Sequence, residues 1–196
     1  MYCPSQIGER IMQNKKINCN AGFSLVELIV VVALVGVLIG GSLITYYTIS
    51  SHNINKAKGY IEDSLNECRS RAMTTQAKSW DVEITSEKVG VYKTDMSTGE
   101  VINIQGNKLP KNVSIEFQQG NNPTVYKLSD TAYDSVKISF KKLSGEVGKV
   151  SITSGGTATE LFTSNEAQYC DIILNYRNRT KKIRLYYATG KFVADE

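Results

Sequence analysis

Glu27 is the ionisable residue whose position most needs a chemical reason. It directly precedes an uncharged, largely apolar run that extends from Leu28 to Ser51. A carboxylate at the edge of such a run is costly in lipid and is normally kept for a function. The junction reads Gly22-Phe23-Ser24-Leu25-Val26-Glu27, in which Ser24 and Glu27 have the spacing of a capping box. One role for Glu27 is therefore local, at the positive end of a helix dipole.

No other residues form a catalytic or metal-binding pattern. The sole histidine, His52, follows the uncharged run, and the sequence contains no G-x-S-x-G, P-loop, H-E-x-x-H or C-x-x-C motif. A histidine without catalytic partners is better explained by a surface role. We therefore expect no enzyme activity, no cofactor and no metal site.

Residues 23–50 are predicted to form a hydrophobic helix. From Phe23 to Tyr47 it would be roughly 37 Å long, enough to cross a hydrocarbon core of about 30 Å. Three basic residues and one acidic residue make residues 1–22 positive, which favours a cytoplasmic N-terminus and an exported C-terminal domain. A cleaved secretory signal is disfavoured because the small residues Ala21 and Gly22 precede the apolar run. A permanent signal anchor fits the run but leaves Glu27 unexplained.

The junction Gly22 to Glu27 resembles the cleavage and methylation site of type IV prepilins and pseudopilins. The resemblance implies that a prepilin peptidase cleaves after Gly22, removing residues 1–22 as a cytoplasmic leader, and methylates Phe23. It also implies that Glu27 pairs with the N-terminal amine of a neighbouring subunit during assembly. Pairing would lower the burial penalty of both charges, and it is compatible with capping.

Two further features of the run concern packing and family. Gly36 and Gly40 form a G-x-x-x-G motif, which can let two membrane helices approach closely. Major type IV pilins usually carry a proline in this segment, whereas this chain has none between Pro4 and Pro110. The departure favours a minor subunit.

Residues 51–78 are predicted to continue the helix in amphipathic form. Apolar residues recur at spacings of three and four, as expected of a helix packed on a core. They are Ile54, Ala57, Ile61, Leu65, Cys68 and Ala72.

Residues 79–196 are predicted to form an exported, β-rich head domain, because apolar and polar residues alternate between turn-forming clusters. The chain as a whole is expected to be α+β, with a long N-terminal helix packed on a mostly antiparallel sheet or small β-sandwich. Ser97-Thr98-Gly99 and Ala188-Thr189-Gly190 suit hairpin turns. The alternating segments are Val82/Ile84, Val89/Val91, Val113/Ile115/Phe117, Val136/Ile138/Phe140, Val150/Ile152, Cys170/Ile172/Leu174/Tyr176 and Ile183/Leu185/Tyr187.

The order of these elements resembles the H-type minor pseudopilin and FimT-like minor pilin family. The resemblance is carried by Cys68–Lys78, Leu109–Phe117, Val136–Phe140 with Gly145, and Tyr187–Val193. It covers nearly the whole chain and implies a pilin-like fold.

The four cysteines divide into two pairs by location. Cys3 and Cys19 lie in the leader, which faces a reducing compartment, so we expect free thiols there. Cys68 lies on the helix stripe and Cys170 on the apolar face of a strand. The sequence leaves open whether these two form a disulfide or remain buried thiols.

The last 26 residues are basic and contain interleaved tyrosines. Some FimT-like proteins are DNA receptors in natural transformation, and cations with aromatics suit phosphate contact and base stacking. The alternative is a solvated hairpin face. Without the leader the chain has 20 basic and 18 acidic residues, a net charge of +2 that does not itself call for nucleic acid. The candidate DNA contacts are Arg177, Arg179, Lys181, Lys182 and Arg184.

The resemblance implies a minor type IV pilin or pseudopilin that acts in filament initiation or at the tip, in type II secretion, a type IV pilus or a competence system. Its expected partners are the prepilin peptidase, other major and minor subunits, the inner-membrane assembly platform and membrane lipid. It would be a single-pass inner-membrane protein before assembly and part of a filament afterwards. The alternatives are a DNA receptor and a plain signal-anchored exported binding protein.

Overall fold

The computed structural model describes residues 23–75, 78–95, 97–120, 122–129, 132–162 and 168–194, without the side chains of residues 41–47, 78 and 162. The predicted leader, with Gly22, Cys3 and Cys19, lies outside these ranges. The chain divides into two compact units, Met1–Leu43 and Ile44–Glu196.

The long helix is α1 (Leu25–Thr74), which has 50 residues. In the second unit its predicted stripe is confirmed. None of the stripe side chains is more than 1% exposed: Ile54, Ala57, Ile61, Leu65, Cys68 and Ala72. The polar residues between them are exposed or half-buried, so one face of this part of the helix belongs to the core.

The helix ends earlier than predicted. We expected it to reach Lys78, but its last residue is Thr74, and Lys78 already pairs with Asp95 in a sheet. The hydroxyl of Thr74 donates to the carbonyl oxygens of Ser70 and Arg71 at 3.2 and 3.1 Å. Bonds of this kind slightly destabilise a helix and favour its end at this point.

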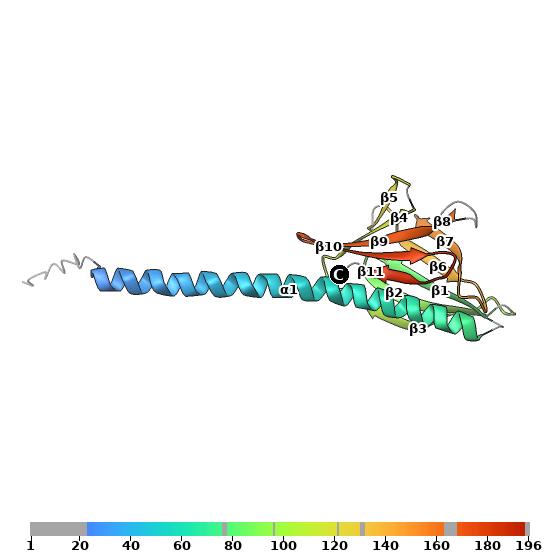
Figure 1. The fold of residues 1–196 in the computed structure, drawn as a ribbon, viewed down its shortest axis with the longest axis horizontal. Coiled ribbons are helices and arrows are strands. Elements are labelled where there is room, and N and C mark those ends of the chain that lie inside the picture. The colour runs from blue at the N-terminus through green and yellow to red at the C-terminus, as the bar shows by residue number, and fades with distance from the viewer. Residues whose placement is uncertain are drawn as a thin grey trace, which may run out of the picture. The chain divides into compact units, whose positions relative to one another are not determined.

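The head contains two sheets, and every strand pair in them is antiparallel (Figure 1). The predicted α+β class is therefore confirmed. The six-stranded sheet has the order β3-β2-β1-β6-β7-β8 and the five-stranded sheet the order β11-β10-β9-β4-β5. The strands are β1 (Lys78–Thr85), β2 (Lys88–Asp95), β3 (Val101–Lys108), β4 (Ser114–Gln119), β5 (Val125–Leu128), β6 (Ser135–Phe140), β7 (Val147–Ser154), β8 (Thr157–Phe162), β9 (Tyr169–Tyr176), β10 (Arg179–Tyr186) and β11 (Phe192–Ala194).

The chain alternates between the sheets in blocks of neighbouring strands. β1 to β3 and β6 to β8 build the larger sheet, whereas β4, β5 and β9 to β11 build the smaller one. Both predicted hairpin turns are present. Gly99 N donates to Asp95 O, and Gly190 N donates to Tyr186 O, each at 2.8 Å.

The strands that the alternation predicted are the interior strands of the two sheets. The strands it missed are β3, β5, β8 and β11, which are the sheet edges. β3 is exposed or half-buried along its whole length, so no face of it needs an apolar pattern.

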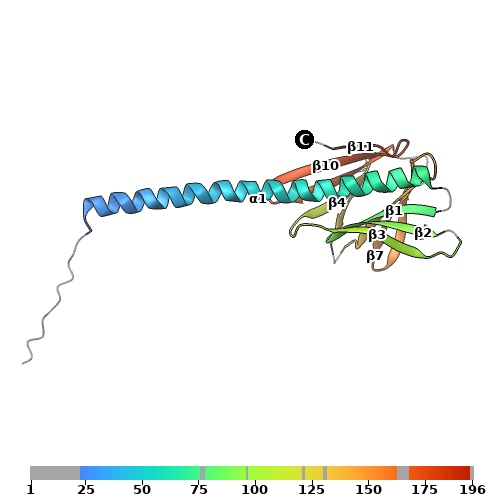
Figure 2. The same ribbon diagram turned by 90° about the horizontal axis from the view of Figure 1, so that it is seen from below.

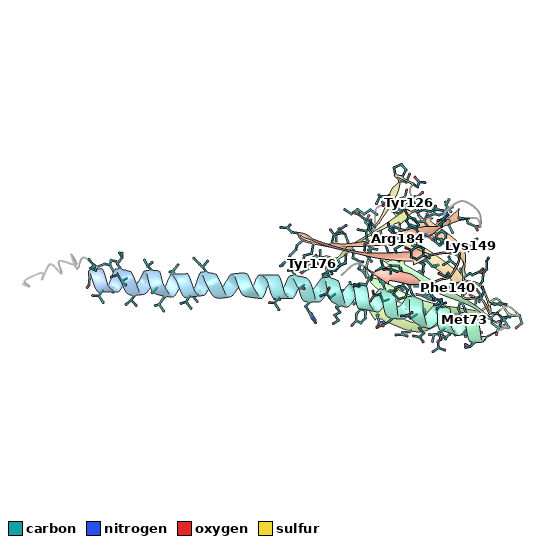
Figure 3. All side chains as sticks on the ribbon, in the orientation of Figure 1. Met73, Tyr126, Phe140, Lys149, Tyr176 and Arg184 are labelled. Carbon is teal, nitrogen blue, oxygen red and sulfur yellow. The ribbon has the colours of Figure 1, made fainter. Side chains whose placement is uncertain are left out.

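One buried cluster joins the helix and both sheets. The Asn53 amide donates to the hydroxyl of Tyr176 on β9 at 3.1 Å, and the Arg69 guanidinium donates to the Thr189 carbonyl at 3.1 Å. On the other side, Arg71 lies over the ring of Trp80 on β1, 5.1 Å from its centre. The amphipathic part of α1 therefore lies between β10 and β11 on one side and β1 and β2 on the other, as Figure 2 shows. Tyr176 is labelled in Figure 3.

Candidate functional site

The first candidate site is the start of α1. Phe23 and Ser24 precede the helix, and Glu27 lies in its first turn. The Leu28 amide donates to the Ser24 carbonyl at 3.1 Å, which makes Ser24 the residue whose carbonyl opens the helical ladder. Glu27 therefore occupies the positive end of the helix dipole, as the capping pattern predicted. Gly22, the predicted cleavage residue, lies outside the described residues.

The large apolar side chains from Phe23 to Ile39 lie outside the buried core of the residues that the structure describes. Every large apolar side chain from Phe23 to Ile39 is at least 47% exposed. They point to all sides of the helix, and a helix that is apolar all round is normally buried in lipid or among other helices. Among the described residues, no helix combines the length and apolar character that crossing a membrane requires. The membrane span over residues 23–50 stays a prediction.

The two glycines of the G-x-x-x-G motif are open. A methyl group added at Gly36 or at Gly40 would meet no atom within 4 Å. Both positions can therefore accept a close neighbour, and their role in helix packing stays a prediction.

Cys68 and Cys170 are both buried and both free. Burial is the main cause that raises the pKa of Cys170 to about 12, with a smaller opposing effect from its hydrogen bond with Tyr187. Burial also raises the pKa of the Cys68 thiol well above its usual range. The structure contains the reduced pair, and thiols of this kind are chemically inert while they stay buried.

The basic C-terminal segment does not form one surface. Side chains alternate along a strand, and partners in register share a face. Arg179 and Lys181 are opposite Tyr176 and Leu174, whose side chains belong to the core face. Lys182 and Arg184 therefore lie on the outer face of the same sheet. Four of the five predicted DNA contacts are therefore divided between the two faces of β10, and Arg177 lies in the turn before it.

On the outer face, Asp171 holds the cations. Arg184 donates two hydrogen bonds to its carboxylate, from Nε at 2.8 Å and from a terminal nitrogen at 2.9 Å, and Lys182 lies 3.6 Å away. The bond to Asp171 is the largest cause that raises the pKa of Arg184. The guanidinium also stacks on Tyr169, 4.2 Å from the ring centre. Arg184 is labelled in Figure 3.

Asp171 is a residue that the sequence analysis did not single out. The sequence does contain a signal for it. Asp171 alternates with the apolar Cys170 and Ile172, and a two-residue turn between β9 and β10 pairs it with Arg184. The net charge of the last 26 residues does not show this pairing, because it ignores the register of the two strands.

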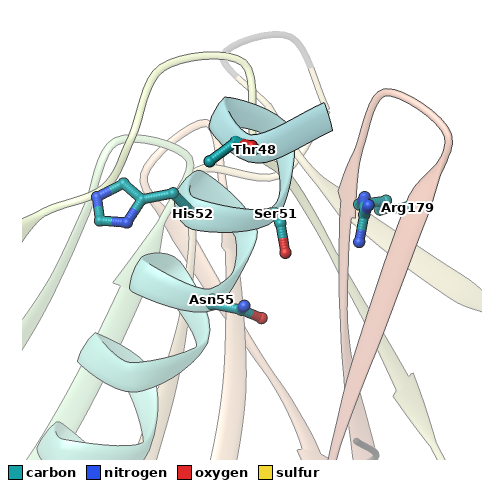
Figure 4. A pocket seen from close by; sticks show the side chains of 5 residues that line it. All are labelled: Thr48, Ser51, His52, Asn55 and Arg179. Atoms are coloured by element: carbon teal, nitrogen blue, oxygen red, sulfur yellow. The ribbon is translucent and has the colours of Figure 1, made fainter. Parts of the chain in front are cut away.

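The helix-facing side of β10 borders a polar hollow. Its lining residues come from the helix and from the start of β10, and they are Thr48, Ser51, His52, Asn55 and Arg179 (Figure 4). Arg177, in the preceding turn, has a φ of 55° and stacks on Tyr176 at 5.3 Å. Within the described ranges, no three acidic, histidine or cysteine side chains gather as a metal site would require.

Comparison with protein-family models identifies one match, the prokaryotic N-terminal methylation motif, at residues 17–43. This segment contains Gly22, Phe23 and Glu27, and it supports a type IV pilin-like protein that a prepilin peptidase processes. No curated protein and no solved structure is significantly similar to the chain.

Proposed function

We propose that this chain is a minor type IV pilin or pseudopilin that is cleaved after Gly22, methylated at Phe23 and assembled through its apolar N-terminal helix. The observation that carries the proposal is the methylation motif at residues 17–43. It coincides with the one carboxylate whose position ordinary membrane anchoring leaves unexplained.

Processing creates the chemistry that assembly needs. Cleavage frees the amine of Phe23, which is a cation one helical turn from Glu27. When helices pack side by side in a low-dielectric setting, the Glu27 carboxylate of one subunit pairs with the amine of the next. Each charge then offsets part of the desolvation penalty of the other.

The exposed part of α1 supplies the driving force. Its large apolar side chains, from Phe23 to Ile39, are exposed and lie outside the core that the described residues form. Lipid covers them before assembly, and the stems of other subunits cover them in the filament, so they stay out of water at both stages. The minor role is supported by the missing proline and by the resemblance of the head to the H-type and FimT-like family.

The proposed location is the inner membrane before assembly and a pilus or pseudopilus afterwards, with the head exported. The proposed partners are the prepilin peptidase, major and minor subunits, and the assembly platform. The head acts by binding partners rather than by catalysis.

The decisive experiment is the intact mass of the protein extracted from membranes. We expect loss of residues 1–22 and one added methyl group on Phe23. A Gly22→Val variant, expressed in the same strain, should keep its leader because the small residue before the cut is replaced. An intact leader on the unmodified chain would instead favour the plain signal-anchored protein.

The DNA-receptor alternative has less support, since Lys182 and Arg184 are engaged by Asp171 and are on the opposite face from Arg179 and Lys181. A salt-sensitive gel shift with the purified protein would restore it, because phosphate contacts weaken steeply with salt.

A further inference from the structure

We propose that the hollow between α1 and the start of β10 binds the phosphate group of an anionic phospholipid. The proposal rests on the proposed function, because it requires a membrane-anchored subunit. It adds a lipid site within the unit Ile44–Glu196, separate from the apolar side chains of Phe23 to Ile39.

The hollow is built from two segments that are far apart in sequence but lie in the same compact unit. Figure 4 shows Ser51 and Asn55, one turn apart, on the side of the helix that faces Arg179. The hydrogen bond from Asn53 to Tyr176 holds this part of the helix beside the β9–β10 turn. The hydrogen bond from Arg69 to Thr189 holds the other end. The direction of the helix along β10 is thus fixed at both ends.

Position along the chain relates this hollow to the membrane surface. Tyr47 ends the densely apolar part of the predicted hydrophobic helix, and Thr48 begins the neutral, more polar residues that close it. At about 1.5 Å per residue, positions 48–55 cover roughly 10 Å beyond that end. The headgroup layer on each side of the hydrocarbon core is about 5–7 Å thick. In a subunit anchored by the preceding run, Thr48 and Ser51, about 1.5 and 6 Å past Tyr47, therefore fall within this layer. Asn55, about 12 Å past Tyr47, lies beyond it.

The charge of the surrounding segments favours an anion. Residues 44–61 contain Lys56 and Lys58 but no aspartate or glutamate, and residues 172–184 contain five cations and no acid. Among the residues that the structure describes, no carboxylate lines the hollow, so these lining groups do not suit a metal ion such as Ca²⁺ or Mg²⁺. The acidic residue nearest to Arg179 in sequence is Asp171, and its carboxylate accepts hydrogen bonds from Arg184 on the other face of the sheet. Arg179 has no ion pair to any residue that the structure describes.

The donors match a phosphodiester. The Arg179 guanidinium presents a planar fork that fits two phosphate oxygens, and the Ser51 hydroxyl and Asn55 amide can donate to the same group. Arg177, two residues before Arg179 and stacked on Tyr176, adds a second cation to the same hairpin turn. Each cation near an anionic membrane surface strengthens binding through the surface potential.

The test is a calorimetric titration of full-length protein in uncharged detergent micelles with dihexanoyl-phosphatidylglycerol. Matched arms use dihexanoyl-phosphatidylcholine and glycerol phosphate. The test variant is Arg177→Gln/Arg179→Gln, in which both side chains are exposed. The control Lys127→Gln/Lys142→Gln removes the same charge from exposed sites elsewhere on the head.

We expect saturable binding of phosphatidylglycerol, weakened about tenfold or more in the arginine variant and unchanged in the lysine control. Equal affinity for the two lipids, or equal weakening in both variants, would overturn the proposal. Glycerol phosphate binding as tightly as the lipid would also overturn it, because the site would then recognise a soluble phosphate. The intact mass of the same preparation reports leader cleavage separately, so failure of lipid binding is distinguishable from failure of the proposed processing.

Discussion

The two parts of α1 have opposite relations to the rest of the chain. From Phe23 to Ile39, every large apolar side chain is exposed. From Ile54 to Ala72, by contrast, the side chains of the apolar stripe are at most 1% exposed. Both parts are helical, so helix formation alone does not distinguish them. The distribution of side chains does, since the first part is apolar all round and the second only along one stripe.

This difference shows where each part finds its stability. The second part is stabilised by the head, because its apolar stripe packs in the shared core and Asn53 and Arg69 donate hydrogen bonds to the head. The large apolar side chains of the first part lie outside the core of the described residues, and under the proposed function lipid or other subunits cover them. Substitutions should therefore affect folding in the second part and assembly in the first, which the following predictions test in order of decreasing effect on the stability of the head.

The largest effect is expected from truncating a buried leucine. Leu65→Ala should lower the free energy of unfolding of the head by about 2–5 kcal/mol, because it removes buried methyl groups and leaves a cavity. The matched Leu34→Ala should change it by less than about 0.5 kcal/mol, since Leu34 is exposed. Denaturant unfolding of the full chain in detergent, followed by the fluorescence of the single, buried Trp80, measures both. Equal losses would show that the two parts fold as one unit.

The next effect is expected where the chain packs against the end of α1. Gly190 has a φ of 60°, and an added methyl group would collide with the carbonyl oxygen of Gly145. Gly190→Ala should therefore cost the head about 2–4 kcal/mol, from backbone strain and overpacking together. Gly36→Ala, in open space, should leave the head unchanged.

If Gly36 serves in helix packing, its variant should lower the yield of assembled filaments while the melting temperature of the head stays constant. A fall in both quantities for Gly36→Ala would contradict the separation of the two parts.

The same distinction explains what the sequence could predict of the fold. The interior strands and the helix stripe were found because burial of one face imposes a period on the residues. β3 and β11 were missed because edge strands are specified by hydrogen bonds to a neighbour, which leave no mark on side-chain type. The helix ends at Thr74 rather than at the predicted Lys78, because the apolar stripe stops at Ala72 and does not specify where the following residues leave the helix.

The candidate sites follow a similar rule. The Gly22 to Glu27 junction could be predicted because its residues are contiguous, so the motif can be recognised without knowledge of the fold. The hollow beside Arg179 could not, since it depends on bringing Ser51 close to the β9–β10 turn. The division of the basic segment likewise needed the register of β9 and β10, which pairs Asp171 with Arg184.

A smaller effect on the free energy of unfolding is expected from raising the pH, which ionises the thiols of Cys68 and Cys170 in the unfolded chain. Burial raises the pKa of Cys170 to about 12 from an ordinary value of 9.0, and it also raises that of Cys68. As pH rises above 9.0 the unfolded thiols ionise while the folded ones stay neutral, so stability present below that pH is lost. Each thiol should contribute a slope of about 1.4 kcal/mol per pH unit until the folded pKa is reached.

Denaturant unfolding of the processed protein between pH 8 and 10 measures this slope. The Cys68→Ala/Cys170→Ala variant should have a lower stability at neutral pH but a flatter dependence above pH 9. An unchanged slope would show that the two thiols do not carry it. Variants of the first part of α1 should leave the slope as it is, because that part contains no cysteine.

The smallest effect on the stability of the head is expected from replacing Glu67, in the second part of α1, or Glu27, in the first part. These two variants compare the two parts most directly. Glu67 pairs with Arg71 at 2.7 Å on the helix surface, and Glu67→Ala should cost the head about 0.2–0.5 kcal/mol. Glu27→Ala should cost it nothing, yet it should abolish or strongly reduce recovery of the subunit in filaments, because the amine of the neighbouring Phe23 loses its counter-charge. Intact mass establishes that the variant is still processed, and filament yield relative to Glu67→Ala reports assembly. A processed Glu27→Ala subunit that assembles normally would reduce Glu27 to a helix cap.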